Sequence, residues 1–196
     1  NPARLAAARI WVVDPIDGTR AFIAGERDWT VSAALVEGGR PVAAALFAPV
    51  SEEVFVAVRG EGATRNGATM RASSRATLQG ASVSGPVPEM DAFGPAAALD
   101  RQPRVRSLAL RLARVATGEL DLALASPNAN DSDLAAADLL VEEAQGRLSG
   151  YEGALLTYNA PVPRHGRLLC AGLPLHAAVL AGRTSQPFLH MPLEKP

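Results

Sequence analysis

The sequence predicts an α+β fold, in which a sheet-rich first half is followed by a second half containing helices. Between residues 10 and 60, apolar runs of strand length alternate with Gly and Pro turn signals. After residue 106, two segments instead carry apolar residues at helical spacing. A chain of 196 residues can bury a sizeable core, as one large domain or as two small lobes.

The first half predicts one buried strand followed by an antiparallel meander. Residues 10–13, IWVV, are expected to form a strand that ends at Pro15, because proline lacks the amide donor of a sheet ladder. The runs 29–39, 40–49 and 52–60 have strand length and are separated by Gly-Gly and Pro-Val-Ser. We expect residues 60–67 to form a glycine-rich turn region, and residues 80–95 to combine a short strand with a loop.

Three helices and two short strands are predicted in the second half. The first helix covers residues 107–119, with Ser107 as its cap and Gly118 at its end. Its apolar face consists of Leu108, Leu112, Val115 and Ala116. A second helix is expected over residues 132–146 and a third over residues 174–182. The predicted strands are residues 120–125 and 167–172.

This pattern divides the chain into two lobes and a tail. Residues 1–85 form the first lobe, with the meander, and residues 86–182 form the second, with the boundary in the Pro/Gly-rich stretch near residue 85. Residues 183–196 show no periodicity, so we expect a loose tail.

Composition narrows the partners that we expect. The formal charge of −1 gives no electrostatic footprint for a nucleic acid polymer. The sequence contains no run of 18 apolar residues, which a membrane-spanning helix would need, and residues 1–11 do not resemble a signal peptide. We therefore expect a cytoplasmic protein without a membrane partner. The single cysteine, Cys170, lies in an apolar run and is expected to be a buried small hydrophobe.

The stretch DPIDGTRA, residues 14–21, is the strongest chemical signal in the chain. Asp14 and Asp17 follow an apolar run, and two carboxylates this close repel each other unless a cation lies between them. The amides of Gly18 and Thr19 would then open a helix whose N-terminus favours an anion. The alternative, in which Asp17 is a plain helix cap within a turn, leaves Asp14 unexplained. The stretch therefore favours a metal ion beside a phosphate.

These residues resemble the inositol monophosphatase superfamily of magnesium-dependent, lithium-sensitive phosphatases, whose first signature is DP[IL]DGT. Residues 34–67 resemble the meander of the family, residues 106–124 its central helix and strand, and residues 131–153 its second signature. The resemblance covers nearly all of residues 9–182. It implies a layered α/β/α/β/α fold whose N-terminal part is missing from this sequence.

The resemblance also assigns metal ligands. Asp14 is similar to the aspartate that bridges two metals, and Ile16 to the residue that lends a backbone carbonyl. Asp17 resembles the ligand of the second metal, and Asp133 the aspartate that completes this site and contacts a substrate hydroxyl. The implied cofactor is Mg²⁺, as two or three ions.

Phosphate binding and catalysis are assigned in the same way. Gly18 and Thr19 resemble the residues whose amides hold the phosphate, and the Thr19 hydroxyl is expected near the attacking water. The resemblance thus makes Asp14, Asp17 and Thr19 the catalytic residues. Asp17, Gly18, Thr19 and Asp133 are the expected phosphate and substrate contacts. A serine nucleophile is not expected, since Ser107 and Ser132 have no evident histidine partner.

The sequence departs from the family pattern at three places. A metal-binding glutamate and a further helical aspartate, which family members carry upstream of the first signature, have no counterpart in these residues. Ser132 stands where the second signature has tryptophan, and Gln145 where it has glycine. Either a third of a usual family member is missing, or this is a reduced form that holds the first metal poorly.

The expected partner is a small phosphorylated metabolite. Residues 122–130, LALASPNAN, lack the carboxylate with which inositol phosphatases hold sugar hydroxyls, and they resemble the 3'(2'),5'-bisphosphate nucleotidase branch. The first candidate substrate is therefore the 3'-phosphate of adenosine 3',5'-bisphosphate. Inositol monophosphate, histidinol phosphate and an inactive metal-binding module are the alternatives, and a homodimer is left open.

Overall fold

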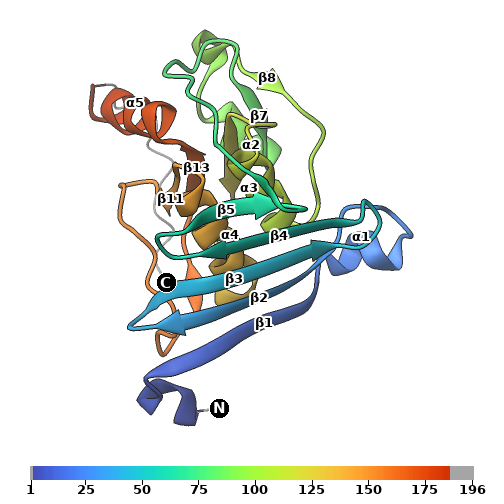
Figure 1. Ribbon diagram of the computed structural model, residues 1–196. Helices are drawn as coiled ribbons and strands as arrows, with labels where there is room; N and C mark the ends of the chain where they lie inside the picture. Colours follow the sequence, from blue (N-terminus) through green and yellow to red (C-terminus); the bar gives the residue numbers. More distant parts are fainter. Residues whose placement is uncertain (1, 186–196) are drawn as a thin grey trace.

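A computed structural model describes residues 2–185 as two β-sheets with helices between them and outside the second sheet. Figure 1 shows the first sheet crossing the molecule, with α3 and α4 behind it. Counted from the first sheet, the layers are sheet, helices, sheet, helices. The described residues therefore form four of the five layers expected for an α/β/α/β/α fold.

The first sheet is a six-stranded antiparallel meander in which each strand pairs with the next. Along its strands, residues facing the helices alternate with residues facing away from them, as the two-residue period of a strand requires. The strands are β1 (Arg9–Asp17), β2 (Thr30–Glu37), β3 (Arg40–Ala48), β4 (Glu53–Val58), β5 (Gly62–Arg65) and β6 (Ala68–Thr69).

Three expectations about this sheet were wrong. Residues 10–13 are not a buried strand, because β1 lies at the edge of the sheet and the Trp11 side chain is 65% exposed. The first strand does not end at Pro15, because β1 continues to Asp17 with an irregular register between Asp14 and Asp17. A proline is tolerated there since β1 is an edge strand. The glycine-rich stretch 60–67 is not only a turn, because it contains β5, whose ends are turned by Gly60, Gly62 and Gly67 at positive φ.

The second sheet has five strands in the order β11, β13, β9, β7, β8. The pairs of β9 with β7 and of β7 with β8 are parallel, and the others are antiparallel. Its strands are β7 (Ser82–Ser84), β8 (Asp100–Arg101), β9 (Leu122–Ala125), β11 (Gly146–Gly150) and β13 (Leu168–Gly172). A separate pair joins β10 (Ala129–Asn130) to β12 (Arg164–His165).

The three helices predicted in the second half are present. They are α3 (Leu108–Ala116), α4 (Asp131–Glu143) and α5 (Leu173–Ser185). The Ser107 side chain caps α3 by accepting a hydrogen bond from the Leu110 amide, as the sequence predicted. Because α5 continues to Ser185, the expected loose tail begins within a helix, and residues 186–196 lie outside the described residues.

The remaining helical turns are short. They are η1 (Pro2–Ala6), α1 (Thr19–Ile23), α2 (Val87–Asp91) and η2 (Pro95–Ala97). The helix α1 was expected after the DPIDGT motif, whereas α2 falls in the stretch that was expected to be a loop. None of the helices within residues 2–185 has the length and hydropathy needed to cross a lipid bilayer.

The main core lies between the two sheets, around α3 and α4. It is rich in alanine and leucine, with Phe55 and Tyr158 as its largest buried side chains. A second cluster fills the opposite face of the second sheet, under α2 and α5. This arrangement places the end of β1 next to the first turns of both α3 and α4.

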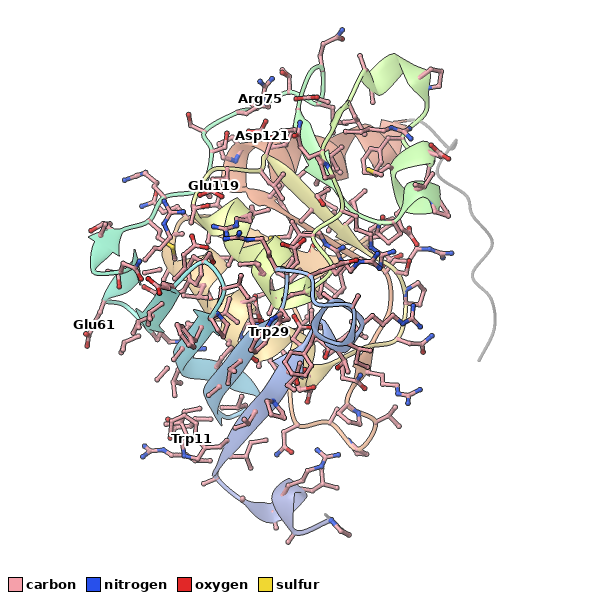
Figure 2. The ribbon with its side chains drawn as sticks, turned by 90° about the vertical axis from the view of Figure 1, so that its right-hand side faces the viewer. Trp11, Trp29, Glu61, Arg75, Glu119 and Asp121 are labelled. Atoms are coloured by element: carbon pink, nitrogen blue, oxygen red, sulfur yellow. The ribbon has the colours of Figure 1, made fainter. Side chains whose placement is uncertain are left out.

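The outer face of the first sheet is apolar and exposed. Figure 2 shows Trp11 at the margin of the molecule, and its side chain is 65% exposed. Cross-strand neighbours continue the apolar surface, because Val31 lies opposite Phe47, and Phe47 opposite Val54. No helix within residues 2–185 covers this face. We define the outer sheet face as Trp11, Val13, Val31, Phe47, Val54, Val56 and Val58.

Candidate metal and phosphate site

Three predicted carboxylates meet where β1 ends. Oxygen atoms of Asp14, Asp17 and Asp133 all lie within 4.8 Å of one another. Side chains three positions apart in a regular strand face opposite sides of the sheet. The register irregularity between Asp14 and Asp17 removes this alternation, so both side chains face the helices. The structure thus brings together the aspartates of the two sequence motifs.

Asp17 is held in place by the start of α3. Its Oδ2 accepts hydrogen bonds from the Ser107 hydroxyl and, at 2.8 Å, from the Ala109 amide. The Ser107 hydroxyl also lies 3.1 Å from that of Thr30 on β2. Asp17 is 7% exposed. Both donors converge on Oδ2, so Oδ1 of Asp17 accepts neither of these hydrogen bonds.

Asp133 enters the cluster from the first turn of α4. Its Oδ2 accepts a hydrogen bond from the amide of Asn130, at 2.8 Å, which closes a capping box around the helix N-terminus. The neighbouring residue, Ser132, occupies the position at which the family has tryptophan. Its carbonyl accepts a hydrogen bond from the Ser32 hydroxyl, at 3.1 Å, so β2 fixes the start of α4 without a large side chain.

The loop between the two aspartates is ordered by local hydrogen bonds. The Ile16 amide donates to Oδ1 of Asp14, at 2.9 Å, and the Thr19 hydroxyl donates to the Ile16 carbonyl, also at 2.9 Å. The hydroxyl oxygen of Thr19 keeps its lone pairs to accept a hydrogen bond from another group. The expected roles of Ile16 as a metal ligand and of Thr19 beside the attacking water stay predictions.

Gly18 is required by the backbone of this loop. Its φ is +87°, and a Cβ placed on it would come within 2.7 Å of the Asp28 carbonyl oxygen. Intrahelical hydrogen bonding in α1 begins with the Ala21 amide, which donates to the Gly18 carbonyl. The amides of Gly18 and Thr19 therefore have no acceptor within the helix. Both remain candidates for phosphate donors.

Burial and mutual repulsion disfavour three ionised carboxylates in this cluster when no cation is bound. Burial raises the pKa of Asp17 to about 6, although the Ser107 and Ala109 donors favour its ionised form, and the charges of Asp133 and Asp14 raise it further. Burial also raises the pKa of Asp14, and the neighbouring charge of Asp133 acts in the same direction. A bound cation would relieve this repulsion.

The donor set fits a hard divalent cation. Three carboxylates offer the oxygen ligands that Mg²⁺ prefers, whereas zinc favours nitrogen and sulfur. Glu26, the first carboxylate after the motif in the sequence, is paired with Arg106, at 2.5 Å. Among the described residues, the cluster consists of Asp14, Asp17 and Asp133.

The other chemically notable residues have structural partners. His165 lies 2.8 Å from Asp131, and His176 lies 2.8 Å from the hydroxyl of Ser149. Cys170 is fully buried, and burial raises the pKa of its thiol well above the usual range, which suppresses the reactive thiolate. None of the three is part of the carboxylate cluster.

Sequence reasoning missed the residues that position the aspartates. Ser107 was expected only as a helix cap, and Asn130 was not singled out. Asn130 carries a recognisable signal, because an Asn followed three positions later by an acidic residue is a variant of the capping box. The bond from Ser107 to Asp17 has no local signal, since these residues are 90 positions apart.

Comparison with known proteins identifies the family of this chain. The model of the inositol monophosphatase family matches residues 2–186. The chain is 36% identical, over 155 residues, to the Nus factor SuhB of Xylella fastidiosa, covering 74% of this chain and 56% of that protein. It is also 36% identical, over 159 residues, to the histidinol-phosphatase of Mycobacterium tuberculosis, covering 74% and 60%.

Solved structures show the same fold. The inositol monophosphatase of Anabaena superposes with a TM-score of 0.78 at 26% identity, covering 92% of this chain and 73% of that structure. By sequence, however, this chain spans only 56% and 60% of the lengths of the two curated relatives described above. The family model, which matches residues 2–186, includes both sheets and the carboxylate cluster.

Proposed function

The chain belongs to the inositol monophosphatase family, and from this premise we propose that it acts as a magnesium-dependent phosphomonoesterase on a small phosphorylated metabolite. The observation that carries the proposal is the convergence of Asp14, Asp17 and Asp133 within 4.8 Å. A carboxylate cluster at the entrance of a glycine turn is suited to holding cations against a phosphate.

The residues of the chain have separate tasks in this proposal. Asp14 and Asp133 would hold cations from two directions, and Asp17 would do so with the one oxygen that α3 leaves unbonded. Because the start of α3 fixes Asp17 and the capping box fixes Asp133, these carboxylates are oriented before any ligand binds. The amides of Gly18 and Thr19 would donate to the phosphate oxygens.

Thr19 would position the attacking water. Its hydroxyl proton is directed to the Ile16 carbonyl, which turns the hydroxyl lone pairs away from that carbonyl. In this orientation Thr19 would accept a hydrogen bond from a water and align it with the phosphorus atom. Bound magnesium would supply positive charge to the phosphate oxygens and lower the pKa of a water. Ser107 is buried and donates its proton to Asp17, so we assign the attack to water. The water oxygen would bond to phosphorus as the ester bond breaks, and the leaving oxygen would take up a proton.

The substrate that we propose first is adenosine 3',5'-bisphosphate, with loss of its 3'-phosphate. Support comes from residues 122–130, where Ser126 and Pro127 stand in a stretch that offers no carboxylate for sugar hydroxyls. Inositol monophosphate and histidinol phosphate are the second choices, since relatives are named for both activities.

An inactive metal-binding module is the alternative function. Three carboxylates suffice to bind a cation, but a fourth ligand outside the cluster is missing from the described residues. The relatives named Nus factor SuhB are called a factor rather than a phosphatase. Metal binding without turnover would favour this alternative.

Phosphate release from the three candidate substrates, measured with magnesium and with excess chelator, tests the proposed function. We expect turnover with magnesium only, inhibition by lithium, and loss of turnover in the variant Asp14→Asn. The matched control is Asp91→Asn, an exposed aspartate paired with Arg101 on the second sheet. Equal phosphate release in chelator, or release that survives Asp14→Asn, would contradict the assignment.

A further inference from the structure

Ser84, at the end of β7, continues the pairing of the second sheet with its side chain. Main-chain hydrogen bonds from β7 extend past β8 to Gln102, whose amide donates to the Val83 carbonyl, at 2.8 Å. The Ser84 hydroxyl then donates to the Pro103 carbonyl, at 3.1 Å, and lies 3.4 Å from the Val105 amide, from which it accepts. A hydroxyl carries one donor and two lone pairs, so this fully buried side chain satisfies both backbone groups.

Arg111 holds the same segment from α3. The Val105 carbonyl accepts a hydrogen bond from Nη1 of Arg111, at 3.2 Å, so both backbone groups of Val105 are bonded to buried side chains. Arg111 is 3% exposed, and its Nε has no hydrogen-bond partner among residues 2–185. Burial lowers the pKa of Arg111 to about 10, the charge of Arg104 lowers it further, and the charge of Asp17 raises it.

A buried guanidinium with incomplete hydrogen bonding is a cost to the fold. Residues that break a packing rule in this way are expected where a site needs them. The bond from Arg111 to the Val105 carbonyl therefore directs attention to what this segment supports.

The segment 103–106 leads directly to the residues that hold Asp17. Ser107 follows it, and the Ser107 amide donates to the Asp28 carbonyl, at 3.1 Å, while its hydroxyl donates to Asp17. The Ala109 amide donates to the same oxygen of Asp17, at 2.8 Å. A shift of the segment would therefore move both donors. A continuous path of hydrogen bonds thus joins the second sheet to a carboxylate at the end of the first sheet.

We propose that Ser84 and Arg111 are positioning residues of the metal site, which hold the segment 103–106 so that the start of α3 orients Asp17 for a cation. The inference rests on the proposed function, because it concerns the same carboxylate cluster. Neither side chain belongs to that cluster, so both act through the donors on α3. Ligands must be held within about 0.5 Å of their productive geometry, so a small displacement of α3 weakens the site.

The variant Ser84→Ala tests the inference without changing a charge. It removes the hydroxyl that holds the segment 103–106. The matched control is Ser149→Ala, because Ser149 is also fully buried and its hydroxyl bonds to the Gly150 carbonyl and to the His176 ring. Both variants should lose some stability. Magnesium affinity distinguishes a positioning role from a merely structural one, since only Ser84 is linked to Asp17.

Isothermal titration with magnesium should give a Kd about fivefold higher in Ser84→Ala than in the wild type, as for the loss of one hydrogen bond, and an unchanged Kd in Ser149→Ala. Raising the magnesium concentration should restore kcat in Ser84→Ala for whichever of the three candidate substrates the wild type hydrolyses. Equal magnesium Kd values in Ser84→Ala and the wild type would overturn the inference while the phosphatase function stands.

Amide hydrogen exchange, followed by NMR, gives a readout in the metal-free protein. In Ser84→Ala and Arg111→Met, the Ala109 amide should exchange at least about fivefold faster, relative to the Leu139 amide within α4, than in the wild type. Ser149→Ala should keep the wild-type ratio. Arg111→Met exchanges an incompletely bonded buried charge for an apolar side chain, so we expect the variant to fold.

The two measurements separate the inference from the proposed function. If the wild type binds no magnesium but the Ala109 amide exchanges faster in both variants, the positioning of Asp17 is supported and the proposed function is contradicted. An unchanged exchange ratio in both variants would overturn the inference, whatever the turnover of the wild type.

Discussion

The hydroxyl of Ser107 donates a hydrogen bond to Oδ2 of Asp17 and links the first turn of α3 to the end of β1, across 90 positions of the chain. The Ala109 amide donates to the same oxygen. Asp17 is thus both the acceptor that satisfies the start of one helix and a member of the carboxylate cluster. A substitution at Ser107 therefore changes the support of Asp17 without removing a carboxylate from the cluster.

Replacing Ser107 with Ala should weaken metal binding and stability together. The variant removes a helix cap and one of the two donors to Oδ2, so we expect a loss of about 1 to 2 kcal/mol in the free energy of unfolding. Magnesium should then stabilise the variant less than the wild type, as measured by the shift of Tm with magnesium concentration. Ser107→Thr, which keeps the hydroxyl, should restore both properties. An unchanged magnesium response in Ser107→Ala would contradict this role.

Replacing Asp133 with Asn should affect catalysis far more than stability. The amide oxygen of Asn can still accept the hydrogen bond from the Asn130 amide, and one repelling charge leaves the cluster. The metal-free variant should therefore unfold within about 1 kcal/mol of the wild type, or be more stable, while turnover falls at least about a hundredfold.

The neighbouring residue Asp131 provides the control for this prediction. Asp131 accepts hydrogen bonds from His165 and from the Asn159 amide, so Asp131→Asn should lower Tm without removing a cluster carboxylate. A large drop in the apo Tm of Asp133→Asn would show that Asp133 is chiefly a structural cap.

Acid should destabilise the fold through His176. Burial lowers the pKa of His176 to about 4, and the charge of Arg147 acts in the same direction, whereas an unfolded histidine titrates near 6.5. The folded state therefore binds fewer protons than the unfolded state between these values. The stability that the neutral ring provides is complete above pH 6.5 and is lost as the pH falls toward 4, by up to about 3 kcal/mol.

Unfolding by urea at pH 7 and at pH 5 measures this effect. His176→Gln keeps a partner for the Ser149 hydroxyl and carries no titrating group, so its stability should fall less between the two pH values. If the free energy of unfolding falls equally in the variant and the wild type between pH 7 and pH 5, the acid sensitivity belongs to other residues.

The outer sheet face should make this chain associate. An uncovered apolar surface of this kind is rare on a monomer, so we expect concentration-dependent dimers or larger species in analytical ultracentrifugation. The double variant Trp11→Lys and Val56→Lys should shift the chain toward the monomer. Val162→Lys is the control, because Val162 is 70% exposed but belongs to a loop outside the first sheet. A monomeric wild type at high concentration would refute this prediction.

The sequence was informative where structure depends on local pattern. The two-residue alternation in β2 to β4 and the helical spacing in α3 and α4 are visible in the letters, and so are Asp14, Asp17 and Asp133 as motif residues. The strand β11 was not predicted, because its residues, GRLSG, combine glycine and serine with a single apolar side chain. It is a strand because β13 pairs with it along its whole length.

The features of the site that the sequence did not predict depend on contacts between residues far apart in the chain. No local pattern shows that the Ser107 hydroxyl faces Asp17, or that Arg111 lies near the same carboxylate. The register irregularity that turns Asp14 and Asp17 to the same side was likewise hidden, because Pro15 alone predicts an end of pairing rather than a continuation of β1.

The long sequence separation within the carboxylate cluster has a consequence for how the chain folds. Closing a loop of about 90 residues costs roughly 4 kcal/mol of chain entropy, so the contact between Asp17 and Ser107 forms only after other contacts have joined the two halves. A cation site made by Asp14, Asp17 and Asp133 would then form late in folding. Magnesium should slow unfolding more than it accelerates refolding, because the transition state for folding would not yet contain the formed site.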